Sequence, residues 1–233
     1  MSSTLLIERQ GAVETWTLND PATRNALSDA IVDGLQSACA RAAQDPTLRI
    51  VVLTGAGGAF CAGGSLGGFA SLIGQPLQEG QTDPLLAMNK SFGDLLHALC
   101  ALPQLLVCRV DGAAMGGGFG LVCCADHVVA TARSVLGTPE VTLGLPPAQI
   151  APFVWQRLGE SAARQCLLQG LSYSAAQALQ VGLVNEMIEP SDEAAWQATL
   201  QRLLRAAPGA VASTKQLLRQ LRGPVQIGRA SCR

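Results

Sequence analysis

The 233-residue sequence has little charge, few aromatic side chains and only two histidines. Charged residues make up 14% of the chain, the formal net charge is −1, and no run of lysine or arginine occurs. Such a chain lacks the basic surface that attracts nucleic acid or an anionic membrane, so we expect neither as a partner. With so few imidazole ligands we also expect no metal site.

The sequence also lacks an export signal and a membrane span. The apolar stretch 5–7 is too short for the core of a signal peptide and ends at Glu8. No apolar run approaches the roughly 20 residues that a spanning helix needs. The 8 cysteines include no C-x-x-C pair, and most lie in apolar stretches. We interpret them as buried thiols in a reducing compartment and expect a cytoplasmic protein.

What is abundant is apolar sequence, 48% of the chain, punctuated by 25 glycines. Residues 3–9 and 12–18 flank Gly11 and predict paired strands. The continuous apolar runs 48–54 and 105–110 predict strands covered on both faces. Helical spacing marks 28–43 and 85–101. Shorter strands are expected at 127–130, 135–136 and 184–188, and helices at 150–158, 161–168, 174–181, 192–206 and 210–221. Strands first and helices later indicate one α/β layered domain.

Glycine-rich turns follow both continuous apolar strands. The first spans residues 55–68, and the second includes Gly112 and the run Gly116-Gly117-Gly118. Glycine lets a backbone turn sharply and approach a ligand closely, and a helix that follows presents free N–H groups. Two such turns side by side could form an oxyanion hole. Close packing of two tight turns is the simpler explanation, and the glycines alone favour it.

Glu140 is the candidate acid/base. It follows Pro139 among apolar neighbours, and a carboxylate in a dry pocket exchanges protons near neutral pH. Local sequence alone slightly favours a surface glutamate at a loop edge.

A serine-hydrolase motif competes with this interpretation. Residues 63–67, GGSLG, fit the G-x-S-x-G nucleophile elbow with Ser65 as the nucleophile. The base would be His127, with Asp94 or Asp111 as the acid. Because glycine is so dense in this segment, a chance match is easy, and His127 is more typical of a packed residue at a strand entry.

Six elements occur in the order seen in one known family. They are the segments 19–27 (NDPATRNAL), 51–66 (VVLTGAGGAFCAGGSL), 110–126 (VDGAAMGGGFGLVCCAD), 137–144 (GTPEVTLG) and 174–185 (SAAQALQVGLVN), and the trio Pro208, Ala210 and Lys215. Together they resemble the crotonase, or enoyl-CoA hydratase/isomerase, family over nearly the whole chain up to about residue 221. Asp20 stands where the family usually has arginine.

The resemblance implies the crotonase fold, a β-β-α spiral followed by a helical region. Residues 1–190 would form the spiral and 191–226 the start of the helical region. Members of the family usually assemble as homotrimers or dimers of trimers. Residues 227–233 match no periodic pattern and correspond to the translation of a common sequencing adapter. We therefore expect a non-native tail on a truncated chain, with an ordinary frayed end as the weaker alternative.

The resemblance also implies roles for individual residues. The N–H groups of Gly64 and Gly117 would hold the thioester oxygen, and Glu140 would be the acid/base. The carbonyl of Ala62 would bind the adenine of coenzyme A, with Arg24 and Asn25 on the loop along the cofactor chain. The partner would be a small acyl-CoA. No separate cofactor is implied, because coenzyme A is part of the substrate.

Two departures leave the reaction open. Gly120 stands where many hydratases have a second glutamate, and Ser65 replaces a usual acidic residue. A single glutamate is typical of the family's isomerases, and on this interpretation Gly120→Glu would restore the missing carboxylate.

Residues 116–121 and 144–154 nevertheless resemble the isohexenylglutaconyl-CoA hydratase branch, which also has glycine at the position of Gly120. We therefore predict an enoyl-CoA hydratase, with a branched isoprenoid-type substrate as one option. The alternatives are a Δ3,Δ2-enoyl-CoA isomerase, a non-catalytic paralogue that binds CoA thioesters, and a serine hydrolase at Ser65.

Overall fold

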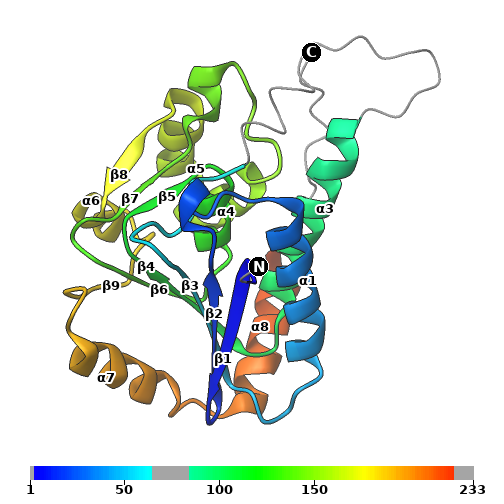
Figure 1. Cartoon of the computed structure of the whole chain (residues 1–233), viewed down its shortest axis with the longest axis vertical. Helices are drawn as coiled ribbons and strands as arrows, with labels where there is room; N and C mark the ends of the chain where they lie inside the picture. Colours follow the sequence, from blue (N-terminus) through cyan, green and yellow to red (C-terminus); the bar gives the residue numbers. More distant parts are fainter. Residues whose placement is uncertain (1–2, 65–83, 223–233) are drawn as a thin grey trace.

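The computed structural model describes residues 3–64 and 84–222, which form two sheets wrapped by helices (Figure 1). The larger sheet has the order β1-β2-β3-β4-β6-β9, and the smaller sheet has the order β5-β7-β8. Strands β1 (Leu5–Gln10) and β2 (Val13–Leu18) form the predicted antiparallel pair around Gly11, whose φ is 61°. Every later neighbour in the larger sheet pairs in parallel.

The central strands are buried on both faces, which explains their continuous apolar runs. They are β3 (Ile50–Gly55), β4 (Leu105–Val110) and β6 (His127–Ala130), and the short edge strand β9 (Glu186–Met187) completes the sheet. Val51 and Leu53 enter the main core, whereas Ile50 and Val52 pack on Trp196 of α7 (Glu193–Leu203). Alternate residues of β3 therefore pack into two different apolar layers, one on each face of the sheet.

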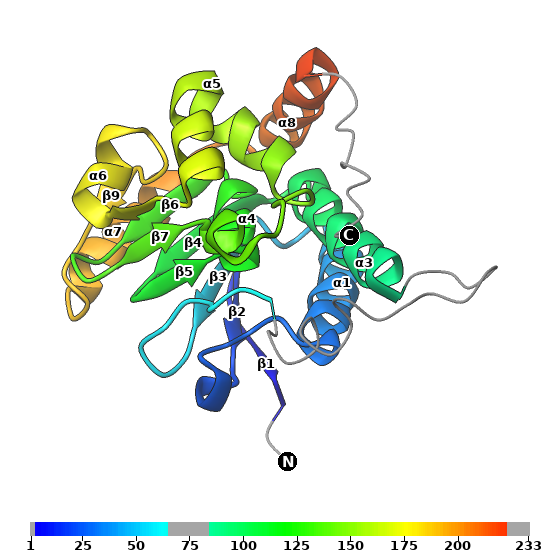
Figure 2. The same ribbon diagram turned by 90° about the horizontal axis from the view of Figure 1, so that it is seen from above.

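Helices α1 (Asp29–Ala43) and α3 (Pro84–Ala101) lie side by side against the main core (Figure 2). Helix α1 begins directly after Ser28, the first residue of the predicted range, because the side chain of Ser28 accepts a hydrogen bond from the amide of Ile31 and caps the helix. Both helices agree with the sequence prediction to within a residue or two.

Two turns of the spiral carry the second glycine-rich segment and the segment that contains Glu140. After β4 the chain crosses to β5 (Ala113–Met115) in the smaller sheet and then enters α4 (Gly117–Cys123). After β6 it crosses to β7 (Val135–Gly137) and the 3-10 helix η2 (Pro139–Leu143). A second 3-10 helix, η1 (Pro21–Thr23), follows β2. The expected β-β-α spiral is present.

The last third of the described chain is helical, as predicted. Helix α5 (Ala151–Gln169) is kinked at Gly159, where φ is 71°, so the two predicted helices meet there as one interrupted helix. The short strand β8 (Ser172–Ser174) leads into α6 (Ala175–Gln180), which starts with a capping box at Ser174. The proposed boundary at residue 190 stays a prediction, and the suspected tail at 227–233 lies outside the described residues.

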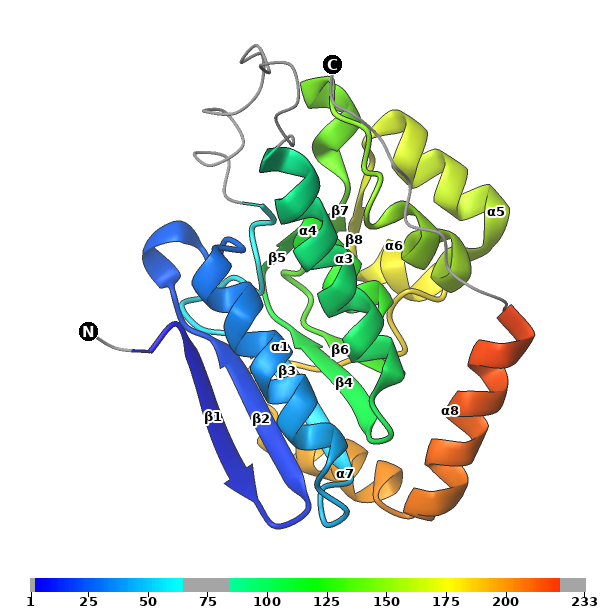
Figure 3. The ribbon, with the colours of Figure 1, turned by 90° about the vertical axis from the view of Figure 1, so that its right-hand side faces the viewer.

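Helix α8 (Pro208–Arg222) lies at the edge of the molecule (Figure 3). Its Lys215 is buried, donates a hydrogen bond of 2.8 Å to the carbonyl of Gln104, and forms an ion pair with Asp126. Since Asp126 also accepts from the amide of Leu106, this contact ties α8 to the end of the sheet. Among the described residues no helix is both long and apolar enough to cross a membrane.

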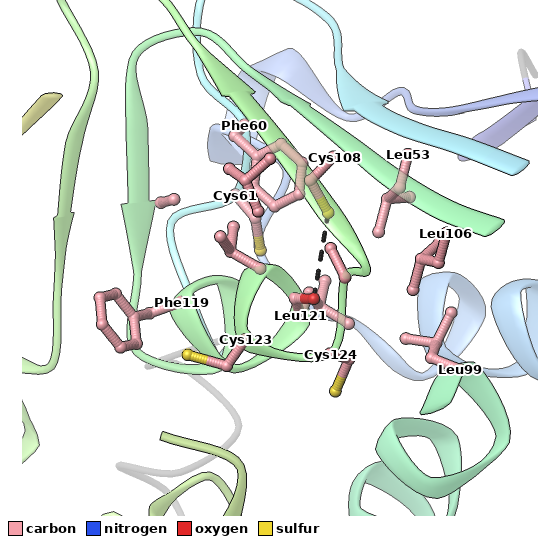
Figure 4. Packing of buried hydrophobic residues seen from close by; sticks show 14 of the residues in the cluster. Leu53, Phe60, Cys61, Leu99, Leu106, Cys108, Phe119, Leu121, Cys123 and Cys124 are labelled. Carbon is pink, nitrogen blue, oxygen red and sulfur yellow. Dashed lines mark hydrogen bonds between the residues drawn. The ribbon is translucent and has the colours of Figure 1, made fainter. Parts of the chain in front are cut away.

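Cysteines take part in the core packing beneath α4 (Figure 4). Cys61 and Cys108 are fully buried, and the thiol of Cys108 lies 4.0 Å from the carbonyl oxygen of Leu121. Burial raises the pKa of both thiols to about 12, which keeps them protonated. They act as small apolar side chains.

Candidate active site

The two glycine-rich turns and the Glu140 segment border one cavity of about 210 Å³. Its walls come from the start of α1, residues 62–64, α3, the start of α4, η2 and the segment 145–150. Leu27, Phe92 and Ile150 contribute apolar surface, and Gly64, Gly117 and Glu140 contribute groups that could meet a polar ligand. The fold therefore brings together three residues that the sequence analysis singled out.

The first turn is held by backbone hydrogen bonds to the segment before α1. The amide of Ala62 donates to the carbonyl of Arg24 at 2.9 Å, and the amide of Leu27 donates to the carbonyl of Gly63 at 2.8 Å. The amide of Gly64, one residue further on, has no acceptor within the described part of the chain. An N–H held rigidly beside a cavity without a partner is suited to bind a ligand oxygen.

The second turn lies directly against the first. Gly116 adopts φ 52° and ψ −118°, and its amide donates to the carbonyl of Gly137 at 2.8 Å. A Cβ on Gly63, where φ is 96°, would lie 2.8 Å from the carbonyl oxygen of Met115 and 3.6 Å from Cα of Gly116. Only glycine allows this approach, so the close packing predicted as the simpler explanation is real.

Gly117 begins α4, so its amide has no partner inside the helix and none elsewhere among the described residues. It therefore resembles the amide of Gly64 in being free beside the same cavity. Close packing of the two turns and a pair of ligand-binding amides are thus compatible interpretations of one structure.

Glu140 faces the second turn from η2. A Cβ on Gly116 would lie 2.9 Å from Oε1 of Glu140, so the carboxyl rests against the backbone there. The other oxygen, Oε2, is buried and has no hydrogen-bond partner among the described residues. Burial raises the pKa of Glu140, and a backbone hydrogen bond opposes part of that effect. A carboxyl in this state can both accept and donate a proton.

The segment that bears Glu140 is anchored on both sides. Before it, the hydroxyl of Thr138 is buried and donates to the carbonyl of Cys166 in α5 at 2.9 Å. After it, the amide of Leu145 donates to the carbonyl of Glu140 at 3.0 Å. These bonds fix the backbone from which the carboxyl projects.

With this geometry in place, comparison with known proteins gives the family. The model of the family described as enoyl-CoA hydratase/isomerase matches residues 8–227. The chain belongs to the enoyl-CoA hydratase/isomerase family.

Individual relatives agree with this assignment. The 2,3-dehydroadipyl-CoA hydratase of Escherichia coli K12 is 35% identical over 222 residues, which cover 94% of this chain and 82% of the relative. A crystal structure of an enoyl-CoA hydratase/isomerase from Marinobacter aquaeolei is 38% identical, with a TM-score of 0.87 over 93% of this chain and 83% of that one. Pseudomonas aeruginosa AtuE is 42% identical, with a TM-score of 0.85 over 92% and 82%. The crotonase fold predicted from the motifs is thereby confirmed.

The signature loop of the family has a structural role that its sequence did not reveal. Asn25 is fully buried, with a left-handed φ of 59°. Its Nδ2 donates to the carbonyls of Ala56 and Ala59 at 2.9 and 2.8 Å, and its Oδ1 accepts from the amide of Asp20. The Asn25 side chain is thus occupied in bracing two loops and is closed to a ligand.

The other predicted coenzyme A contacts have different positions. Ala62 lines the cavity, whereas Arg24 is exposed and is not among the lining residues. Their roles toward coenzyme A stay predictions.

Gly120 lies one turn into α4, and its environment was not foreseen. A Cβ there would lie 2.4 Å from Cγ2 of Ile150 and 3.8 Å from Cδ1 of Leu96. Gly120→Glu would therefore restore a second carboxylate only if the side chain of Ile150 moved, because Ile150 now fills the space. No local pattern marks Ile150, since its contact with Gly120 joins segments 30 residues apart.

The base and acids proposed for serine hydrolysis, His127, Asp94 and Asp111, do not line this cavity. Ser65 itself lies outside the described residues. His127 starts β6, where its Nε2 lies 3.1 Å from Glu186 without hydrogen-bond geometry, and burial lowers its pKa to about 4. The described residues that line the cavity include no histidine. Within the same residues, no group of three potential metal ligands is arranged around one point.

Proposed function

We propose that this chain is an enoyl-CoA hydratase, which adds water across the C2–C3 double bond of an acyl-CoA thioester. The observation that carries the proposal is the unpartnered Oε2 of Glu140, buried in the cavity that Gly64 and Gly117 also line. A buried carboxylate oxygen without a partner is costly, and its retention is expected where a substrate supplies the missing contact.

The proposed chemistry needs only these three groups. Glu140 removes a proton from water as the water oxygen bonds to C3, and the C2–C3 electron pair moves into the thioester to form an enolate. The amides of Gly64 and Gly117 stabilise the charge on its oxygen, and removing such a donor typically costs about 100- to 1000-fold in turnover. The same carboxyl then protonates C2, which yields the 3-hydroxyacyl thioester.

The remaining assignments follow the family. The carbonyl of Ala62 would accept from the adenine of coenzyme A, and Arg24 would lie along the cofactor chain. No further cofactor takes part in this scheme. The protein would assemble as a homotrimer or a dimer of trimers in the cytoplasm.

Isomerisation is the second candidate, because a single carboxylate suffices to move a proton between C2 and C4. Hydration is favoured by the names of the relatives, since the E. coli protein is a 2,3-dehydroadipyl-CoA hydratase and a Thermus thermophilus protein 34% identical is named a putative enoyl-CoA hydratase. The likeness of residues 116–121 and 144–154 to the isohexenylglutaconyl-CoA hydratase branch favours a branched isoprenoid-type substrate.

The test is a panel of straight and branched enoyl-CoA thioesters, each assayed for water uptake and for double-bond migration. Glu140→Gln should abolish both reactions, because it removes the proton acceptor while preserving the shape. Glu160→Gln, the same change at an exposed glutamate, is the control. Near-native turnover in Glu140→Gln would contradict the assignment, and double-bond migration without water uptake by the native protein would establish the isomerase.

A further inference from the structure

We infer that Ile150 is a specificity-determining residue whose side chain replaces the second carboxylate with an apolar wall that receives an alkyl branch of the substrate. This inference rests on the proposed hydratase function and narrows its substrate class. It comes from the packing between α4 and the start of α5, where Gly120 and Ile150 meet.

The positions that a Cβ would take on the glycines of α4 show where this apolar wall lies. A Cβ on Gly117 would point at Leu27 and Phe92, both of which line the cavity. Gly120, three residues later, lies on the same side of the helix. Its Cβ would point at Ile150, 2.4 Å away, and Ile150 lines the cavity as well. A side chain at position 120 would therefore have to enter the space that Ile150 occupies.

The polar character of this wall is low. Ile150 is only 3% exposed, and the nearby ring of Phe92 adds more hydrocarbon. The two acidic residues among the described lining residues are Glu140, which is partly buried and has a buried Oε2, and Asp29, which is exposed at the start of α1. Ile150 offers a water molecule no hydrogen bond, so a water there would depend on the polar lining residues Asn89, Ser91 and Gln149 for its partners, whereas an alkyl group would gain apolar contact with Ile150 itself.

The choice of substrate follows from this difference. With a carboxylate at position 120, that side of the cavity would hold a water molecule and exclude an alkyl branch. With Ile150 in its place, the water must be held from the side of Glu140, and the opposite side is suited to an alkyl substituent near the reacting carbons.

The test compares but-2-enoyl-CoA with 3-methylbut-2-enoyl-CoA, which differ by one branch methyl. The native protein should favour the branched thioester in kcat/KM. Ile150→Ala should lower the branched-to-straight ratio about tenfold, the size expected for losing contact with one methyl group. Ile150→Val should lower it less and serves as the second variant if the alanine variant does not fold.

Leu96 supplies the matched control. It is fully buried and its Cδ1 also faces the Cβ position of Gly120, but it is not among the lining residues. Leu96→Ala and Leu96→Val remove the same kind of core contact, so they should lower stability and leave the substrate ratio unchanged.

The outcomes separate this inference from the proposed function. If the protein hydrates both thioesters but the ratio stays within twofold in Ile150→Ala and Ile150→Val, the specificity role is refuted and the hydratase function stands. If it prefers the straight thioester, the apolar wall does not select a branch. If neither these two thioesters nor the wider panel is hydrated, the proposed function fails and the inference falls with it.

Discussion

Gly116→Ala should show whether the geometry of the site can be disturbed, with a loss of turnover larger than the loss of fold stability alone would cause. Gly116 joins β5 to α4 with φ 52° and ψ −118°, a combination that side chains rarely adopt. An added Cβ would also lie 2.9 Å from Oε1 and 3.5 Å from Cδ of Glu140. One methyl group thus strains the backbone and pushes against the proposed catalytic carboxyl.

The two effects have different sizes. Backbone strain of this kind costs about 1–3 kcal/mol, which for a domain of this length lowers Tm by roughly 2–12 °C. To restore an ordinary contact of 3.4 Å, the Glu140 oxygen must retreat by about 0.5 Å. Since a misplacement of about 1 Å can cost roughly 100-fold in rate, we expect turnover to fall about tenfold or more.

The assay measures Tm by circular dichroism and enoyl-CoA hydration at a temperature where every variant is folded. Gly182→Ala is the control, because Gly182 has φ 76° but nothing within 4 Å of its would-be Cβ. It should lose stability and keep its turnover. Native turnover in folded Gly116→Ala, or an equal loss of turnover in Gly182→Ala, would refute the reasoning.

Three further predictions concern charge and burial. Because burial raises the pKa of Glu140 above its ordinary value of 4.5, the stability linked to its protonation is full below that value and is lost as pH rises through the folded-state pKa. Glu140→Gln should therefore raise Tm at pH 7 but not near pH 4, and an equal rise at both values would contradict this. Lys215→Met should cost about 1–3 kcal/mol in urea unfolding by removing the ion-pair partner of Asp126, whereas Lys90→Met, which removes a side chain that is 75% exposed, should cost about 0–1 kcal/mol. Cys61, with a thiol pKa of about 12, should react with iodoacetamide at pH 8 only after unfolding, and rapid labelling of the folded protein would contradict its burial.

The sequence predicted an element well where its residue pattern follows directly from its surroundings in the fold. The run 105–110 is apolar throughout because both faces of β4 are covered, and its predicted bounds match the observed strand. Strands β5 and β8, with three residues each, were missed, although β7, which is equally short, was predicted at 135–136. The sequence predicted two helices, 150–158 and 161–168, with a break between them. In the structure they form the single helix α5 with a kink at Gly159, a continuity that depends on packing and not on local sequence.

The site was only partly readable from the sequence, for a similar reason. Gly64, Gly117 and Glu140 stand in motifs, so the resemblance identified them, and the fold then placed them at one cavity. Asn25 stands in a motif too, yet the motif does not say whether its side chain faces a ligand or, as observed, the loop at residues 56–60. The contact between Gly120 and Ile150 arises only when α4 packs on α5, and no periodicity records it.

The distribution of unsatisfied polar groups gives a physical reason to place the chemistry at this cavity. Among the described residues, four buried side-chain atoms lack a hydrogen-bond partner, and Oε2 of Glu140 is the only carboxylate oxygen of the four. The others are Gln104 Oε1, His127 Nε2 and Arg157 Nε, and none of those residues lines the cavity. Each such group costs about 1–3 kcal/mol. Asn25, by contrast, satisfies both ends of its amide within the same loops. This contrast, with Asn25 fully paired and Glu140 open beside two free amides, supports the proposal that a polar ligand binds at Glu140.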